Sequence, residues 1–199
     1  MNRFFSEGSV NWRSLQELPN KLFVCGFCDL NVSSVRGYKL GRHNDGSGEQ
    51  TGGIYICPNC GGPSFMSPNG ARYPTPPLGN SVQHVPDGLY ALYEEARRAS
   101  SQNCFTAAVL LCRKMLMNIA VQQGAQEGLK FIEYVSFLSE QGFVPPNGTH
   151  WVDHIRRKGN EATHEIAVMA EQDARDLILF IEMLLRFIYE FPSMIPVAP

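Results

Sequence analysis

Apolar positions follow a helical period throughout the second half of the chain. Five helical segments are predicted there, at about residues 88–101, 105–123, 129–141, from 149 onward, and 171–191. The second segment is apolar almost all round, which predicts a central buried helix. The fifth begins with Glu171 and Asp173, which suit the positive end of a helix dipole, and it is expected to end before Pro192.

The first half of the chain is interrupted by turn-forming residues. Residues 1–88 contain 13 of the 18 glycines and 8 of the 13 prolines, and residues 22–24 and 54–56 favour strands. Residues 65–87 follow neither hydrophobic period and include Pro74, Pro76 and Pro77, which predicts an extended linker. We therefore expect a small β domain at 1–64, a linker at 65–87 and a helical domain at 88–199. The predicted fold class is mainly α.

Composition and charge predict a globular protein outside the membrane. The hydrophobic fraction is 44% and the net charge is −2, with 7 basic and 6 acidic residues in 1–88, so no chain-wide basic field indicates nucleic acid. The N-terminus lacks the uninterrupted apolar stretch of a secretory signal. The apolar stretch 177–191 contains three charged residues and falls short of the roughly 20 residues that span a bilayer. We expect a cytoplasmic protein with no membrane partner.

Four cysteines form two closely spaced pairs, Cys25 with Cys28 and Cys57 with Cys60, 28 residues apart. Two cysteines three positions apart at a tight turn can direct both sulfurs to one metal ion, and two such turns supply the tetrahedral set that zinc prefers. Because all four ligands are cysteines, the site has no open position and its zinc is expected to be structural. The strand-forming residues before each pair predict a zinc ribbon.

Two roles for the ribbon remain open on sequence grounds. One is a module for stability or docking. The other is contact with nucleic acid through Arg36, Lys39, Arg42 and His43, although these basic residues are few.

The fourth helical segment carries titratable side chains on one face. At about 100° per residue, five polar residues fall within about 80° of one another, and they are His150, His154, Arg157, Glu161 and His164. The apolar residues gather opposite them, including Trp151 and Ile155. Histidine exchanges protons near neutral pH and arginine binds phosphate, so the face suits phosphodiester chemistry. The alternative interpretation involves no catalysis. Polar residues on the outer face of an amphipathic helix are normally only solvated, and Gly159 could end the helix.

Three stretches of the helical half resemble a known bacterial family. They are Tyr93-Glu94-Glu95-Ala96, Ala107-Ala108 with Arg113-Lys114-Met115-Leu116, and Arg156-Arg157-Lys158-Gly159-Asn160-Glu161-Ala162-Thr163-His164. Over about residues 88–191 the chain resembles a domain-of-unknown-function family found alone, behind zinc ribbons and attached to type I restriction subunits. That family is similar to the HEPN superfamily of helical bundles, so the resemblance implies a HEPN-like bundle of about five helices behind the ribbon.

The resemblance also implies a catalytic pair. HEPN ribonucleases carry an arginine and, four to six residues later, a histidine, and they act as dimers without metal. Arg157 and His164 match, with six residues between them. By resemblance His164 serves in acid–base catalysis and Arg157 stabilises the phosphate, with His154 and Glu161 as helpers. Lys158 departs from the polar residue, such as asparagine, that often follows the arginine in active members.

Two functions follow from these features. The first is an RNA-targeting endoribonuclease of a defence or toxin system, acting as a homodimer through its helical domain. The second is a non-catalytic module that dimerises, or that docks on a larger nuclease or helicase or on nucleic acid, since many HEPN domains do not cleave.

Overall fold

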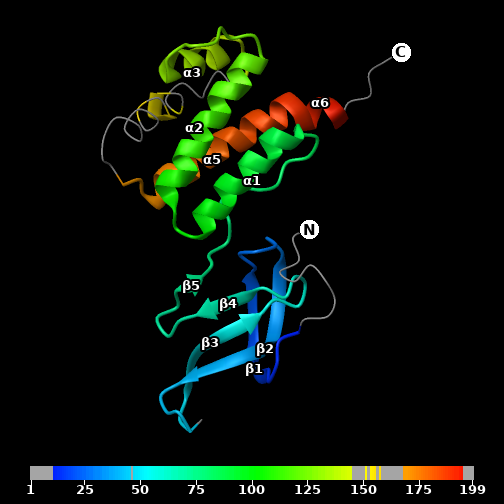
Figure 1. The fold of residues 1–199 in the computed structure, drawn as a ribbon, viewed down its shortest axis with the longest axis vertical. Helices are drawn as coiled ribbons and strands as arrows, with labels where there is room; N and C mark the ends of the chain where they lie inside the picture. Colours follow the sequence, from blue (N-terminus) through cyan, green and yellow to red (C-terminus); the bar gives the residue numbers. More distant parts are fainter. Residues whose placement is uncertain are drawn as a thin grey trace. The chain divides into compact units, whose positions relative to one another are not determined.

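The computed structural model describes residues 11–45, 47–144, 151, 153–155, 157 and 168–194. Its elements divide into two compact units, Met1–Pro77 and Leu78–Pro199. The first unit contains a sheet and the second contains helices (Figure 1).

The N-terminal unit is a five-stranded antiparallel sheet in the order β1-β2-β3-β4-β5. Its strands are β1 (Gln16–Val24), β2 (Asn31–Gly41), β3 (Gln50–Ile56), β4 (Pro63–Met66) and β5 (Arg72–Tyr73). The strands predicted at 22–24 and 54–56 lie within β1 and β3. Each strand pairs with the next one along the chain, so the sheet is an antiparallel meander.

The predicted fold class, mainly α, is wrong. Strands make up 20% of the described residues and helices 44%, so the protein combines a five-stranded antiparallel sheet with a helical unit. The error has a physical cause in β2, where Ser33, Ser34 and Gly37 hide the alternation of apolar and polar residues that marks a strand. The two short strands β4 and β5 each have few residues with which to show a period.

One glycine is required where β2 passes β3. A Cβ atom on Gly37 would lie 1.8 Å from the carbonyl oxygen of Ile54, which is backbone and cannot move aside. A Gly37→Ala substitution is therefore expected to lower the free energy of unfolding of this unit by about 3 kcal/mol. Thermal or denaturant unfolding measures the change. Gly41→Ala on the same strand is the matched control, since its Cβ would meet only an ordinary contact at 3.6 Å, and equal destabilisation by both variants would contradict this account.

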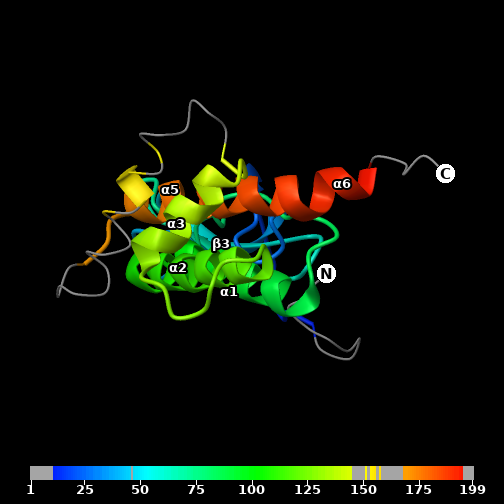
Figure 2. The same ribbon diagram turned by 90° about the horizontal axis from the view of Figure 1, so that it is seen from above.

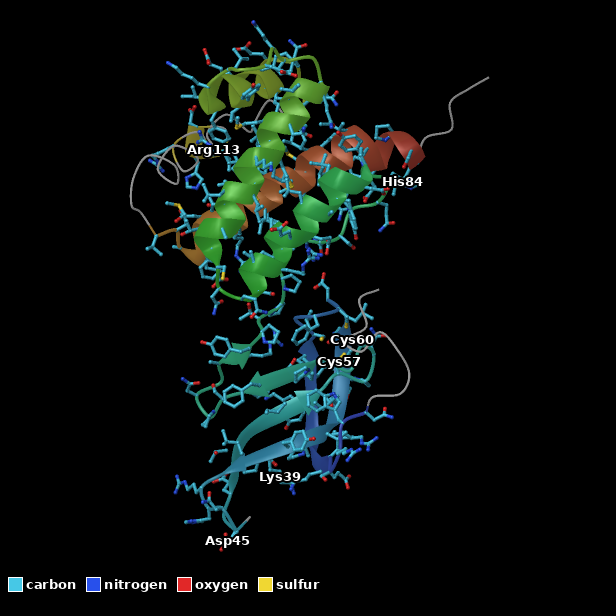
Figure 3. The ribbon with its side chains drawn as sticks, in the orientation of Figure 1. Lys39, Asp45, Cys57, Cys60, His84 and Arg113 are labelled. Carbon is cyan, nitrogen blue, oxygen red and sulfur yellow. The ribbon has the colours of Figure 1, made fainter. Side chains whose placement is uncertain are left out.

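The helical unit is built around α2 (Phe105–Gln122). This helix packs against α1 (Asp87–Ser101), α3 (Phe131–Glu140) and α5 (Glu171–Leu185), as Figures 1 and 2 show. The predicted central helix is confirmed: its inward residues, among them Cys112, Met115 and Ile119, are almost completely buried. Arg113, the cation of this apolar helix, lies over the ring of Phe131 at 4.3 Å from its centre and so links α2 to α3 (Figure 3).

Of the helices that the structure describes, α2 alone is long and apolar enough to cross a bilayer. The buried face of α2 packs within the helical core. A helix buried in a protein core can be as long and as apolar as one that spans a membrane, so this composition alone does not distinguish the two.

The last helix runs past the predicted end at Pro192. After α5 the chain makes a π-helical turn at Arg186–Glu190 and continues as α6 (Phe191–Met194). The π turn changes the pattern of backbone hydrogen bonds ahead of Pro192. Pro192 therefore lies in the first turn of a new α segment, where its missing N–H group costs little free energy.

Residues 65–87, predicted as a linker, include β5 and also a segment that packs on the helices. Leu78 and Val82 are buried in the helical core. The buried carboxylate of Glu182 accepts the backbone N–H of Asn80 at 2.9 Å, and that of Glu190 accepts the N–H of Gln83 at 2.7 Å. Two acidic residues of α5 and the π turn thus hold this segment against the helical unit, and the segment in turn supplies hydrogen bonds to their buried carboxylates.

Candidate metal centre and arginine–histidine site

The four cysteines lie in two turns of the same construction at one end of the sheet. Cys25 follows β1 and Cys57 follows β3. In each turn the cysteine accepts a hydrogen bond from the backbone N–H four residues later, at 2.9 Å in both cases. The donors, Asp29 and Gly61, both have the left-handed backbone conformation that closes such a turn. The two halves of the centre are therefore built alike.

The sulfur positions fit a tetrahedral ion. The Sγ atoms of Cys25 and Cys60 are 3.7 Å apart, those of Cys28 and Cys57 are 3.8 Å apart, and all four lie within 4.8 Å of one another. Bonds of about 2.3 Å to a central zinc would place tetrahedral sulfurs about 3.8 Å apart. Backbone N–H groups also point at two of the sulfurs, Phe27 at Cys25 and Gly62 at Cys60. Four cysteines thus lie where they can hold a metal ion. Figure 3 shows two of them, Cys57 and Cys60, on the sheet unit.

Burial disfavours the thiolate form of two of these cysteines. It raises the pKa of Cys25 from 9.0 to about 11, and it raises the pKa of Cys60 still further. Burial also opposes ionisation of Cys28, but hydrogen bonds from the Leu30 backbone and the Asn59 side chain lower its pKa. Without a cation the cluster would remain largely protonated at neutral pH, so a bound metal ion would have to displace these protons.

A second group of polar side chains lies on the helical unit. Trp151 packs edge-on against Phe180, with ring centres 5.2 Å apart, and Ile155 is fully buried. His154 is half-buried and also lies against α5, through Asp176, whereas Arg157 is exposed. The polar face predicted for this segment is therefore exposed at Arg157, while His154 lies against α5 as Trp151 does.

His154 lies between a cation and an acid. Its Nδ1 atom is 3.4 Å from Nη2 of Arg157, and its Nε2 atom is 2.9 Å from Oδ2 of Asp176. The second contact is an ion-pair contact by distance, although Nε2 is not aligned for a hydrogen bond. Asp176 is held in turn by Gln172, whose side-chain N–H donates to Oδ1 at 2.7 Å. Arg157 is exposed, so its guanidinium can reach a ligand in solvent.

Three of the predicted residues of this site lie outside the described residues: His150, Glu161 and His164. The structure therefore brings His154 and Arg157 together and leaves the Arg157 and His164 pair as a prediction. Sequence reasoning missed Asp176 and Gln172. The spacing of four residues between Gln172 and Asp176 indicates that they are neighbours on one helix. It does not indicate which other helix packs beside them.

Comparison with known proteins identifies the helical unit. Residues 94–194 match the family model described as "Domain of unknown function (DUF4145)". No curated protein and no solved structure matches the chain. The match spans α1 to α6, includes Arg157 and Asp176, and covers half of the chain. The protein belongs to the DUF4145 family.

Proposed function

We propose that the helical unit is a HEPN-like, metal-independent endoribonuclease that acts as a homodimer, and that the sheet unit holds a structural zinc ion. Arg157 and His164 are the proposed catalytic pair. The observation that carries the proposal is the exposed guanidinium of Arg157 beside His154, which Asp176 holds from the other side.

This arrangement suits the cleavage of an RNA phosphodiester. His164 would take the proton of the 2′-hydroxyl, whose oxygen would attack phosphorus to form a 2′,3′-cyclic phosphate. The bond from phosphorus to the 5′ oxygen would break, and that oxygen would take a proton from a second acid, a role that we assign to His154. Arg157 would bind the phosphate oxygens, on which negative charge grows during the attack. Every group needed is a side chain, so no catalytic metal is required.

An apolar stripe on the last helices supports a dimer. Leu179, Phe187, Phe191 and Met194 are all exposed, and the rings of Phe187 and Phe191 pack edge-to-face at 5.4 Å. On the helix, Gln172 and Asp176 precede Leu179 along the same face. A second copy seated on this stripe would therefore approach the His154 and Asp176 contact, and two such sites would share one groove.

Replacing Phe187 tests the dimer. Phe187→Glu is expected to convert a micromolar solution of the protein from dimer to monomer, because it places a charge in the apolar stripe. Size-exclusion chromatography with light scattering measures the mass. Leu110→Glu is the matched control, since Leu110 is comparably exposed but lies on α2. A dimer that survives in the Phe187 variant would contradict this interface.

The zinc assignment rests on the donor set. Four cysteine sulfurs at tetrahedral spacing suit zinc, and no ligand position is left for water or substrate. We therefore assign the ion a structural role. Metal analysis of the purified protein should find one zinc per chain, and a different ion or none would contradict the assignment.

The cleavage proposal is tested with the whole purified protein and labelled single-stranded RNA. Cutting should proceed without added divalent ions and leave 2′,3′-cyclic phosphate ends, which a phosphatase removes only after the ring is opened. Intact RNA over a set of diverse sequences would contradict the proposal and favour the non-catalytic role. A requirement for added metal ions would also contradict it.

A further inference from the structure

A groove runs along one face of α2. Five of its residues are spaced as successive members of a single helical face over about three turns, and they are Leu110, Arg113, Lys114, Met117 and Val121. Glu127, in the loop after the helix, also lines it, and its volume is about 490 Å³. We call this feature the α2 groove.

The floor of the α2 groove is apolar. Met117 and Val121 are half-buried and pack against the helical core, and Leu110 is 41% exposed. The helix is already held by its contacts with α1, α3 and α5, so this face is not needed to attach it to its own unit. An apolar stripe that stays exposed on such a helix is typical of a surface that contacts another molecule.

Both charged residues of α2 lie at the groove. The helix contains no acidic residue, and its two basic residues are Arg113 and Lys114. Arg113 lies over the ring of Phe131, which holds its guanidinium beside α3 (Figure 3). Lys114 is exposed, and its ammonium group makes no hydrogen bond or ion pair with any residue that the structure describes. This part of the groove is therefore basic.

The other end of the groove is acidic. Glu127 follows the C-terminal end of α2, is exposed, and forms no ion pair within the described part of the chain. The charge along the groove therefore changes sign, from basic at Arg113 and Lys114 to acidic at Glu127. A fatty acid or another anionic amphiphile would match the basic end only, because its apolar tail would lie against the Glu127 carboxylate. Side chains of both charges on one apolar scaffold match the whole groove.

We propose that the α2 groove binds an amphipathic helix of a partner protein. Helices bind such grooves through apolar residues at spacings of three, four and seven, which would contact Leu110, Met117 and Val121. Acidic side chains of the partner would lie against the basic part of the groove and a basic side chain against Glu127. Acidic residues in the first turns and a basic residue in the last also suit the dipole of the partner helix, which would then run parallel to α2.

A designed peptide and the full-length protein test the proposal. The probe is a labelled peptide of about 18 residues, long enough to form a helix and to cover three turns of α2. It carries leucines at spacings of three, four and seven, two glutamates beside the first leucines and one lysine beside the last. Fluorescence anisotropy should show saturable binding in the micromolar range. A second peptide, with the same leucines but every charge reversed, should bind about tenfold more weakly.

Charge reversal on the protein locates the binding. Lys114→Glu should weaken binding of the first peptide about tenfold and strengthen binding of the second, because it reverses a charge that each peptide contacts. Leu110→Glu should weaken binding of both peptides, since it places a carboxylate on the apolar floor. Arg98→Glu and Tyr90→Glu are the matched controls, because both residues are exposed on α1. The melting temperature of each variant shows that it has folded.

Three results would overturn the proposal. They are no saturable binding of the first peptide, unchanged binding by the folded Lys114→Glu and Leu110→Glu variants, and equal affinity of the wild-type protein for the two peptides. A change from dimer to monomer in Leu110→Glu would assign the groove to a second copy of this chain instead. His154 and Arg157 do not line the groove. RNA cleavage should therefore be unchanged in Lys114→Glu, so failure of this proposal and failure of the cleavage proposal give different results.

Discussion

A Cys57→Ser substitution is expected to unfold the sheet unit and leave the helical unit folded. Among the residues that the structure describes, the buried cluster of the sheet unit contains five apolar residues besides its cysteines, namely Leu18, Phe23, Val32, Tyr55 and Met66. A core of this size rarely stabilises a domain alone. A structural zinc ion contributes about 10–16 kcal/mol in small domains of this kind, which is more than a core of this size supplies. Removing one of its four ligands should therefore abolish the sheet.

Hydrogen exchange by residue measures this outcome. Amides of β1, β2 and β3 should exchange rapidly in the variant, while those of α2 and α5 stay protected. A chelator strong enough to strip zinc from the wild-type protein should produce the same pattern. Cys104→Ser is the control, because Cys104 is exposed and lies outside the cluster. Protected strands in a metal-free Cys57→Ser protein would show that the sheet is stable by packing alone.

The metal centre was the easiest part to predict from sequence. A tight turn fixes the positions of two cysteines three apart, so local spacing alone places both sulfurs of a pair together. Only the meeting of the two pairs depends on the fold, and the parallel construction of the two turns provides it. The identity of the ion depends on chemistry at the same four atoms and remains a proposal.

The helices were also predictable, because their apolar period extends over many residues. The expected segments at 88–101 and 105–123 differ from α1 and α2 by one residue at one end. The sheet was not predictable to the same degree. β2 buries Val32 and Ser34 on its inner face, and a buried serine breaks the pattern of alternating polarity. Ser34 is tolerated there because its hydroxyl donates to the carbonyl of Ile56 at 2.8 Å, a contact between strands that no local pattern reveals.

The arginine–histidine site could be predicted from sequence only in part. The helical period placed His154 and Arg157 on one face, opposite Trp151 and Ile155. It could not indicate that Asp176 of another helix would lie 2.9 Å from His154, since that contact depends on how two helices pack. The exposed line of Tyr38, Ile54, Phe65 and Tyr73 across the sheet was missed for a related reason. These residues come from four strands, and only the strand register brings them into line.

Substitutions at Arg157 and His164 are expected to have the largest effect on activity. Arg157→Ala and His164→Ala should each lower the rate of RNA cleavage by at least about 100-fold, as loss of a catalytic acid, base or charge-stabilising group does. The Arg157→Ala protein should remain folded, because Arg157 is exposed on its helix. Single-turnover cleavage of labelled RNA measures the rate, and the melting temperature monitors folding. Arg175→Ala is the matched control, since Arg175 is an exposed arginine of α5 that pairs with Glu171 on the same helix.

A substitution at Asp176 tests whether this residue contributes to catalysis or only to the stability of the fold. Asp176→Asn keeps the size of the side chain and the Gln172 contact but removes the charge beside His154, so it should lower kcat about tenfold and leave KM unchanged. A positioning residue acts on the reacting group, whereas a structural residue would lower the melting temperature with kcat intact.

Arg157→Lys should restore part of the loss in Arg157→Ala, because lysine keeps the charge but cannot form two parallel bonds to phosphate. Full activity in Arg157→Ala would assign the guanidinium to assembly, and the helical unit would then be a docking module rather than an enzyme.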